Sequence, residues 1–74
     1  MAAFTWGDTV RIMAQAPAEA RPGSIGEVCG IREIETPDQA KEFAAPIGTK
    51  LYLIEFGDGK SIETKEDWLE QVEA

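Results

Sequence analysis

The chain has 74 residues, and its 14 acidic and 7 basic residues give a formal net charge of −7. Apolar residues make up 43% of it and charged residues 28%, a balance typical of a small globular domain and not of a disordered segment. The sequence has no histidine, which excludes the usual general base at neutral pH, the nucleophile–histidine pairs and the commonest zinc ligand. We therefore expect one domain with a thin core, no catalytic residues, no metal site and no cofactor.

Composition also limits the cellular compartments and the classes of partner that we expect. The single cysteine, Cys29, cannot form an internal disulfide, which fits a reducing cytoplasm. No stretch approaches the length of apolar sequence that a membrane span needs, and the N-terminus lacks the features of a signal peptide. Nucleic acid and anionic membranes attract clustered Lys and Arg, so the acidic charge disfavours both. We expect a cytoplasmic protein, for which a basic partner is permitted but not implied.

The first third of the chain is predicted to be two strands joined by a loop. Apolar and polar residues alternate over 9–13, as in a half-buried strand. Residues 14–24 contain prolines and a glycine and are interpreted as a loop. A second strand is predicted over 25–34, and Gly26 and Gly30 inside it indicate a bend, a bulge or a close backbone approach.

The pattern then changes to a helical period. Thr36 is suited to cap a helix, Pro37 to its first position, and Gln39 has the spacing of a capping box. An apolar stripe at helical spacing follows, formed by Ala40, Phe43, Ala44 and Ile47. These signals predict a two-turn helix at about 37–44.

The last third is predicted to be strands over 50–56, 60–64 and 69–72, with a turn at 57–59 and a single 3₁₀ turn at 65–67. The glycines that flank Asp58 are a strong turn signal. A terminal helix over 65–73 is the alternative to the last strand, because Trp68, Leu69 and Val72 also fit helical spacing.

Two motifs resemble a known class of small β-proteins. The first motif is Gly7-Asp8-x-Val10-x-Ile12, which is followed after a loop by Gly23-x-x-Gly26-x-Val28, and the second is Tyr52-x-Ile54-x-Phe56-Gly-Asp-Gly. They resemble SH3-like barrels of the KOW type, as found in small bacterial proteins. The resemblance implies a mostly β fold, a five-stranded SH3-like barrel with a short helix between strands 2 and 3. The domain would span residues 1–74, with the helical insert at about 36–48.

The resemblance implies less about function. Several families of this kind have no known function, one includes immunity proteins of toxin systems, and another forms part of the nitrile hydratase beta subunit. The motifs are structural glycines and alternating apolar positions, which specify a fold better than an activity. The KOW domains that bind RNA are usually basic, and this chain is acidic.

Strand alternation predicts one unusual surface. If Val28 and Tyr52 point into the core, then Cys29, Ile31, Leu51 and Leu53 point outward and form an apolar patch. Either the 37–44 helix folds back and covers this patch with Ala40, Phe43 and Ile47, or the patch binds a partner chain. Loss of folding in Leu53→Glu would support burial, and a changed oligomeric state would support an interface.

Two tryptophans complete the set of candidate residues. Trp6 and Trp68 are either core residues or interface anchors. Cys29 is interpreted as an inert strand residue, and the clustered carboxylates as a solvated surface that lacks the spacing of a calcium loop. The candidate partner-binding residues are Ile31, Phe43, Leu51, Leu53 and Trp68.

The function that these observations favour is a small, non-catalytic protein-binding module. Its partner would be a basic or mixed-charge protein, and the resemblance alone suggests an immunity or inhibitor type of role. The alternative is a homo-oligomeric structural or accessory protein. The third hypothesis is an enzyme whose site forms only at a subunit interface.

Overall fold

The structure is a computed structural model that describes residues 4–72. Residues 1–3, which belong to the N-terminal segment predicted to lack a signal peptide, lie outside the described residues. So does residue 73, which belongs to the alternative C-terminal helix.

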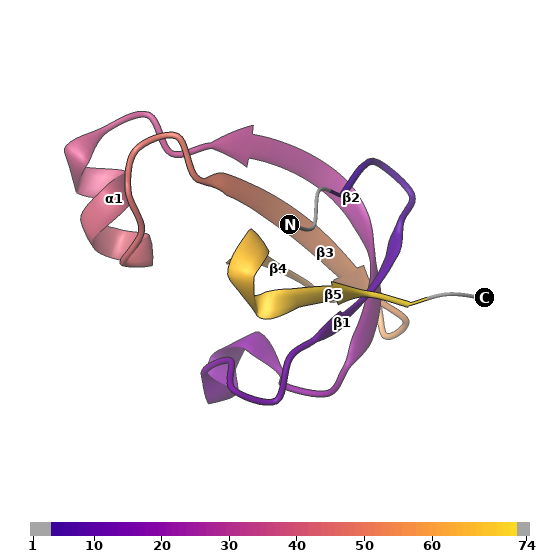
Figure 1. The fold of residues 1–74 in the computed structure, drawn as a ribbon. Helices are drawn as coiled ribbons and strands as arrows, with labels where there is room; N and C mark the ends of the chain where they lie inside the picture. Colours follow the sequence, from indigo (N-terminus) through magenta and orange to yellow (C-terminus); the bar gives the residue numbers. More distant parts are fainter. Residues whose placement is uncertain (1–3, 73–74) are drawn as a thin grey trace.

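Five strands form one antiparallel sheet in the order β4-β3-β2-β1-β5 (Figure 1). The strands are β1 (Thr9–Ile12), β2 (Ile25–Glu33), β3 (Lys50–Phe56), β4 (Ser61–Lys65) and β5 (Leu69–Gln71). One α-helix, α1 (Pro37–Phe43), connects β2 to β3, and two 3₁₀ helices, η1 (Ala18–Ala20) and η2 (Glu66–Trp68), precede β2 and β5. The prediction of a mostly β chain with a short helix is confirmed, and the alternative helix at the C-terminal end is wrong. Strands β4 and β5 are the two edges of the sheet.

The core lies on the concave side of this curved sheet. It receives side chains from four of the strands, two residues from the segment between β1 and β2, and one residue that precedes β1. Its buried members are Phe4, Val10, Ile12, Ala16, Ala20, Val28, Tyr52, Ile54, Phe56 and Leu69. Burial of these side chains is the main source of stability, because each large apolar residue contributes about 1.5–3 kcal/mol.

Tyr52 fastens the start of the described chain to this core. Its ring packs edge-on against Phe4, with 5.4 Å between the ring centroids. Its hydroxyl accepts a hydrogen bond from the backbone N–H of Phe4 at 3.4 Å and donates one to Glu66 Oε2 at 3.1 Å. Burial raises the pKa of the Tyr52 hydroxyl, and the hydrogen bond to Glu66 adds to this effect. One buried side chain thus ties the N-terminal segment to η2.

Helix α1 begins as its sequence predicts. The Thr36 side chain accepts a hydrogen bond from the Gln39 N–H at 3.2 Å, and Gln39 Oε1 accepts one from the Glu35 N–H at 2.8 Å. None of its residues is fully buried. Figure 1 shows α1 beyond the ends of β2 and β3, at one extremity of the molecule.

Gly26 marks a close approach between β2 and β3. A Cβ atom at this position would lie 2.5 Å from Ile54 Cγ2 and 2.8 Å from the carbonyl oxygen of Glu55. Only a residue without a side chain fits here, which agrees with the interpretation of glycine inside a strand.

A β-bulge in β2 corrects the predicted outward patch. Val28 pairs with Ile54 and Gly30 pairs with Leu53, so Cys29 is the extra residue of the bulge. The inserted residue reverses the alternation, and Ile31 therefore pairs with Tyr52 and packs half-buried against the core. The prediction that Ile31 points outward is wrong for this reason.

The predicted patch is also interrupted at Leu51. Leu51 is only 1% exposed, and Ile34, which lies at the same end of the sheet next to α1, is equally buried. Neither residue belongs to the main core, so a second small core lies at this end of the sheet. Leu53, at 36% exposed, is the large apolar residue of the patch that stays at the surface.

Candidate functional site

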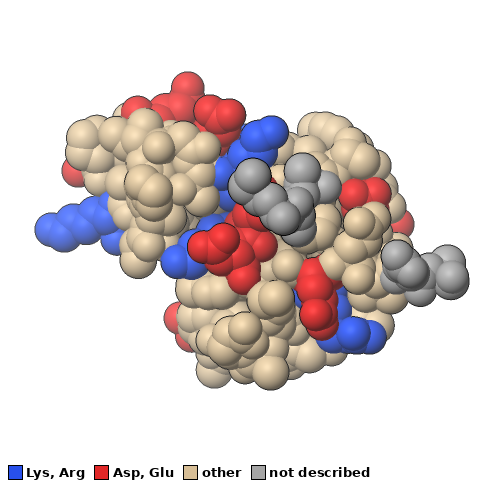
Figure 2. Space-filling view, viewed as in Figure 1, with Lys and Arg blue, Asp and Glu red and all other residues tan. Residues whose placement is uncertain are grey.

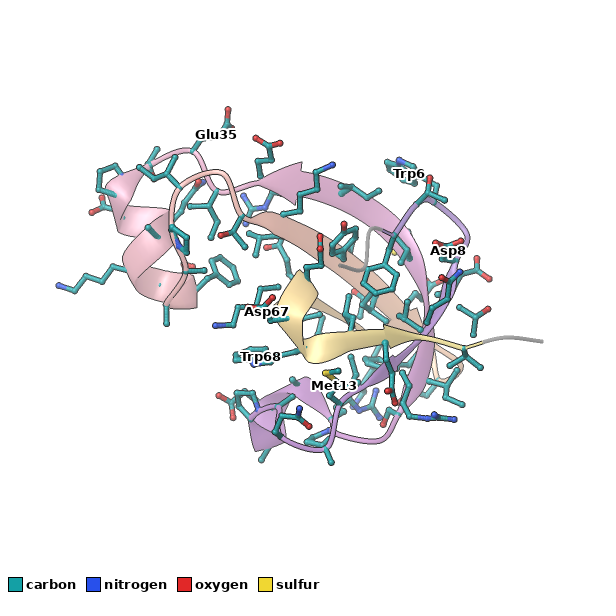
Figure 3. The ribbon with its side chains drawn as sticks, in the orientation of Figure 1. Trp6, Asp8, Met13, Glu35, Asp67 and Trp68 are labelled. Atoms are coloured by element: carbon teal, nitrogen blue, oxygen red, sulfur yellow. The ribbon has the colours of Figure 1, made fainter. Side chains whose placement is uncertain are left out.

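A groove opens between η1, α1 and the junction of β4 with η2. Its volume is about 260 Å³. Its apolar lining consists of Pro17, Ala20, Phe43, Ala44, Ile62 and Trp68, and its acidic lining of Glu19, Glu42 and Glu63. Figure 3 shows the Trp68 side chain pointing away from η2 into the space between α1 and η1, and Figure 2 shows the surface hollowed beside the α1 lobe.

One wall of the groove, η1, is held in place by Arg21. This residue ends η1 in the left-handed conformation, with φ of 63°. Its guanidinium lies 4.6 Å from the centroid of the Phe56 ring and donates to both carboxylate oxygens of Asp58, at 2.9 and 3.4 Å. The hydrogen bond from Arg21 lowers the pKa of Asp58 to about 2. The loop before β2 is thereby fastened to the turn between β3 and β4.

The opposite wall, α1, is held by Lys65. The Lys65 ammonium donates to the carbonyl oxygen of Ala44, which ends α1, at 3.4 Å. The same ammonium lies 4.6 Å from the centroid of the Trp68 ring, a cation–π distance. One side chain of β4 therefore connects the end of α1 to the aromatic residue of the groove.

The charges at the groove are unevenly neutralised. Arg32 donates to both oxygens of Glu63, at 2.5 and 2.6 Å, and this hydrogen bonding raises the pKa of the guanidinium. Glu19 and Glu42 are exposed, and neither forms an ion pair within residues 4–72. Two carboxylates without a direct ion pair thus stand at opposite walls of the groove, and together they outnumber the Lys65 ammonium that lies over Trp68. This balance of charge favours a cationic ligand.

The structure brings together two of the five candidate residues. Phe43 and Trp68 line the same groove, and both are half-buried. Ile31 and Leu51 belong to packed regions, and Leu53 lies on the outward face of β3, so these three residues do not contribute to the groove. The predicted patch is therefore not a single surface.

Sequence reasoning missed the residues that the other segments contribute to the groove. Pro17 and Ala20 lie in the predicted loop over 14–24, and Ile62 lies in the predicted strand over 60–64. The groove is lined by segments that lie more than forty residues apart in the sequence, and no local pattern predicts contact between such distant segments. The proline-flanked Ala-Glu-Ala run, now η1, was the one local signal available.

Trp6 occupies a separate surface. It is 64% exposed, on a turn that is closed by a hydrogen bond from the Asp8 N–H to the Thr5 carbonyl oxygen at 3.1 Å. The turn is attached to β2 by two backbone hydrogen bonds of 2.9 Å, between Gly7 and Val28 and between Val28 and Asp8. Figure 3 shows Trp6 and Trp68 at well-separated places in the molecule.

The chemistry that the groove offers is recognition by shape and charge. Its side chains are apolar groups and carboxylates, which bind and orient a ligand. Cys29 lies outside the groove, half-buried, with its thiol donating to the Leu53 carbonyl oxygen at 3.5 Å. Within the part of the chain that the structure describes, no group of three or more acidic or cysteine residues is arranged to hold a metal ion.

No protein-family model, curated protein or solved structure matches the chain. Across residues 4–72, no helix has the length and apolar character needed to cross a membrane.

Proposed function

We propose that the protein is a small, non-catalytic binding module whose groove holds a segment of a basic or mixed-charge partner protein. The observation that carries this proposal is the groove itself, where the half-buried Phe43 and Trp68 lie between two exposed carboxylates, Glu19 and Glu42, that form no direct ion pair within residues 4–72. Aromatic residues supply much of the affinity at protein interfaces, because they bury a large area at a low cost in side-chain entropy.

The charge of the chain supports the same kind of partner. A net charge of −7 steers basic molecules toward the protein and repels acidic ones. Glu19 and Glu42 concentrate this effect at the two walls of the groove. Apolar contacts in the groove would supply affinity, and the carboxylates would supply specificity and speed of association.

The finer description of the fold is part of the proposal. A bulged β2, a 3₁₀ helix before the last strand and the order β4-β3-β2-β1-β5 support an SH3-like barrel. A cytoplasmic location is supported by the single cysteine, and an immunity or inhibitor type of role by resemblance alone.

Selection of a random dodecapeptide library tests the proposal. We expect the selected peptides to combine Arg or Lys with apolar residues and to bind the wild-type protein. Binding should be lost in the double variant Glu19→Lys, Glu42→Lys, which reverses the charge at both walls. The double variant Glu27→Lys, Glu55→Lys is the matched control, because it changes the net charge equally at exposed positions outside the groove.

Two results would overturn the proposal. One is the selection of no peptide, and the other is equal loss of binding in both double variants, which would indicate attraction to the net charge alone. A basic peptide held by general attraction would also be released by modest salt, since exposed charges are screened over about 8 Å at physiological ionic strength.

The alternative of a homo-oligomer is favoured by one observation. Trp6 and Leu53 are exposed apolar residues outside the groove. Sedimentation of the wild-type protein and of Leu53→Glu at several concentrations tests this alternative. A wild-type protein that stays monomeric at the highest concentration would eliminate it.

A further inference from the structure

The floor of the groove contains the free edge of a strand. Ile62 and Glu63 both line the groove, although they are consecutive residues of β4. Consecutive side chains of a strand point to opposite faces of its sheet. A cavity that touches both must therefore run along the edge of the strand that lies between the two faces.

The backbone of this edge has no partner strand. Within residues 4–72, β4 is the last strand of the sheet and pairs only with β3. Among the described residues, Ser61–Thr64 form no backbone hydrogen bond except those to β3, and Lys65 is the N-cap of η2. Alternate N–H and C=O groups of β4 are thus directed toward the groove, where an extended chain can pair with them.

We propose that the groove takes its ligand as an added strand, an extended segment of the partner protein that pairs with the free edge of β4. This inference rests on the proposed function and specifies how the same groove recognises its partner. Hydrogen bonds to the backbone of β4 would supply affinity independent of sequence, and alternate side chains would supply specificity.

The two faces at this edge predict an alternating ligand. The Ile62 face leads to the core side of β4, where Ile62 and Trp68 both pack against the core. On the Glu63 side, the groove is lined by two carboxylates, Glu63 and Glu42, and the guanidinium of Arg32 pairs directly with Glu63 alone, so the balance of charge there is negative. Apolar residues of the ligand would face the first side and basic residues the second.

A second copy of the chain is a poorer occupant of this edge. Its own β4 reads Ser61-Ile62-Glu63-Thr64-Lys65, so self-pairing would place its Glu63 against an already acidic face. Each copy also carries a net charge of −7, which opposes close approach.

The test uses a synthetic peptide that alternates arginine and valine over seven residues, with both ends blocked. In a strand, residues whose side chains share a face also direct their N–H groups to the same edge. The peptide begins and ends with arginine, so it has four arginines and three valines. Methylating the backbone nitrogens of the three valines removes one set of donors, and methylating those of the last three arginines removes the other. Titration calorimetry measures the affinity of each peptide for the full chain.

Strand addition predicts an asymmetric result. One methylated set should weaken binding about tenfold or more, and the other should leave it within about twofold, because only one set faces β4. Slower amide hydrogen exchange at alternate residues of β4 should accompany binding of the unmethylated peptide.

Three outcomes would overturn the inference. Equal effects of the two methylated sets, with the unmethylated peptide still bound at the groove, would leave the proposed function standing and eliminate strand addition. Failure of the unmethylated peptide to bind would contradict the alternating pattern of the ligand. The proposed function would then still be tested separately, by the peptides that the library selection yields. A stable dimer whose β4 amides are protected without peptide would show that a second copy occupies the edge.

Discussion

Leu51 and Leu53 share the outward face of β3 but differ sharply in exposure. Leu51 is 1% exposed and Leu53 is 36% exposed. Replacing a fully buried leucine with alanine removes its transfer free energy and leaves a cavity, at a cost of about 3 kcal/mol or more. The same change at a third-exposed position should cost about 1 kcal/mol, since part of the side chain is already in water.

The difference is large relative to the stability of so small a domain. A domain of this length has a free energy of unfolding of about 4–11 kcal/mol. Leu51→Ala should therefore lower the midpoint of thermal unfolding by about 12 °C or more, and Leu53→Ala by about 4–8 °C. Circular dichroism during heating and urea titration measures both. Equal losses in the two variants would refute the placement of Leu51 in a second core beside α1.

Three further predictions concern packing and charge. Gly26→Ala should lower the free energy of unfolding, measured by urea titration, by about 3 kcal/mol or more, because the added Cβ would overlap Ile54. Gly57→Ala should be neutral, because a Cβ there meets open space. Similar losses in the two variants would contradict the close approach of β2 and β3 at Gly26. Thr64→Val should raise the free energy of unfolding by about 1 kcal/mol, because the Thr64 hydroxyl is buried without a hydrogen-bond partner among the described residues. A lower free energy of unfolding in this variant would mean that the hydroxyl forms a hydrogen bond. Arg21 lowers the pKa of Asp58 to about 2, so this ion pair stabilises the fold fully above about pH 4 and loses its effect as the pH falls through 2. Asp58→Asn should consequently lose less stability than the wild-type protein between pH 4 and pH 2, and parallel losses in acid titrations followed by circular dichroism would count against this pairing.

Most of the elements could be predicted because their signals are local. The cap at Thr36 depends on residues three positions apart, and it forms the predicted hydrogen bond to Gln39. The turn at 57–59 and the alternation of β3 are equally local. Such signals reflect local backbone preferences, and the tertiary structure of the chain agrees with them at these positions.

The orientation of β2 beyond its bulge could not be predicted in the same way. Gly30 indicated a bulge or a bend, but the alternation of the strand was continued through it. One inserted residue, Cys29, reverses every later side chain, so Ile31 faces the core. The burial of Leu51 depends on the end of the sheet beside α1, and its own sequence context does not show that contact.

The groove was the least predictable feature, because its parts are distant in sequence. Phe43 and Trp68 were selected as candidates for separate reasons, and only the fold places them in one groove. The free edge of β4 depends on strand order, which no alternation pattern specifies. Local sequence patterns predicted the helix and the strands, but the groove forms only where the folded chain brings these elements together.

The central claim is that the groove, and not another surface, binds a partner. The indole N–H signals of Trp6 and Trp68 test it directly in a two-dimensional NMR titration with a library-selected basic peptide. The chain has two tryptophans, and they report on separate surfaces. The account predicts that the Trp68 signal shifts on binding while the Trp6 signal stays in place. A shift of Trp6 with Trp68 unchanged would contradict it and move the binding surface to the turn beside β2.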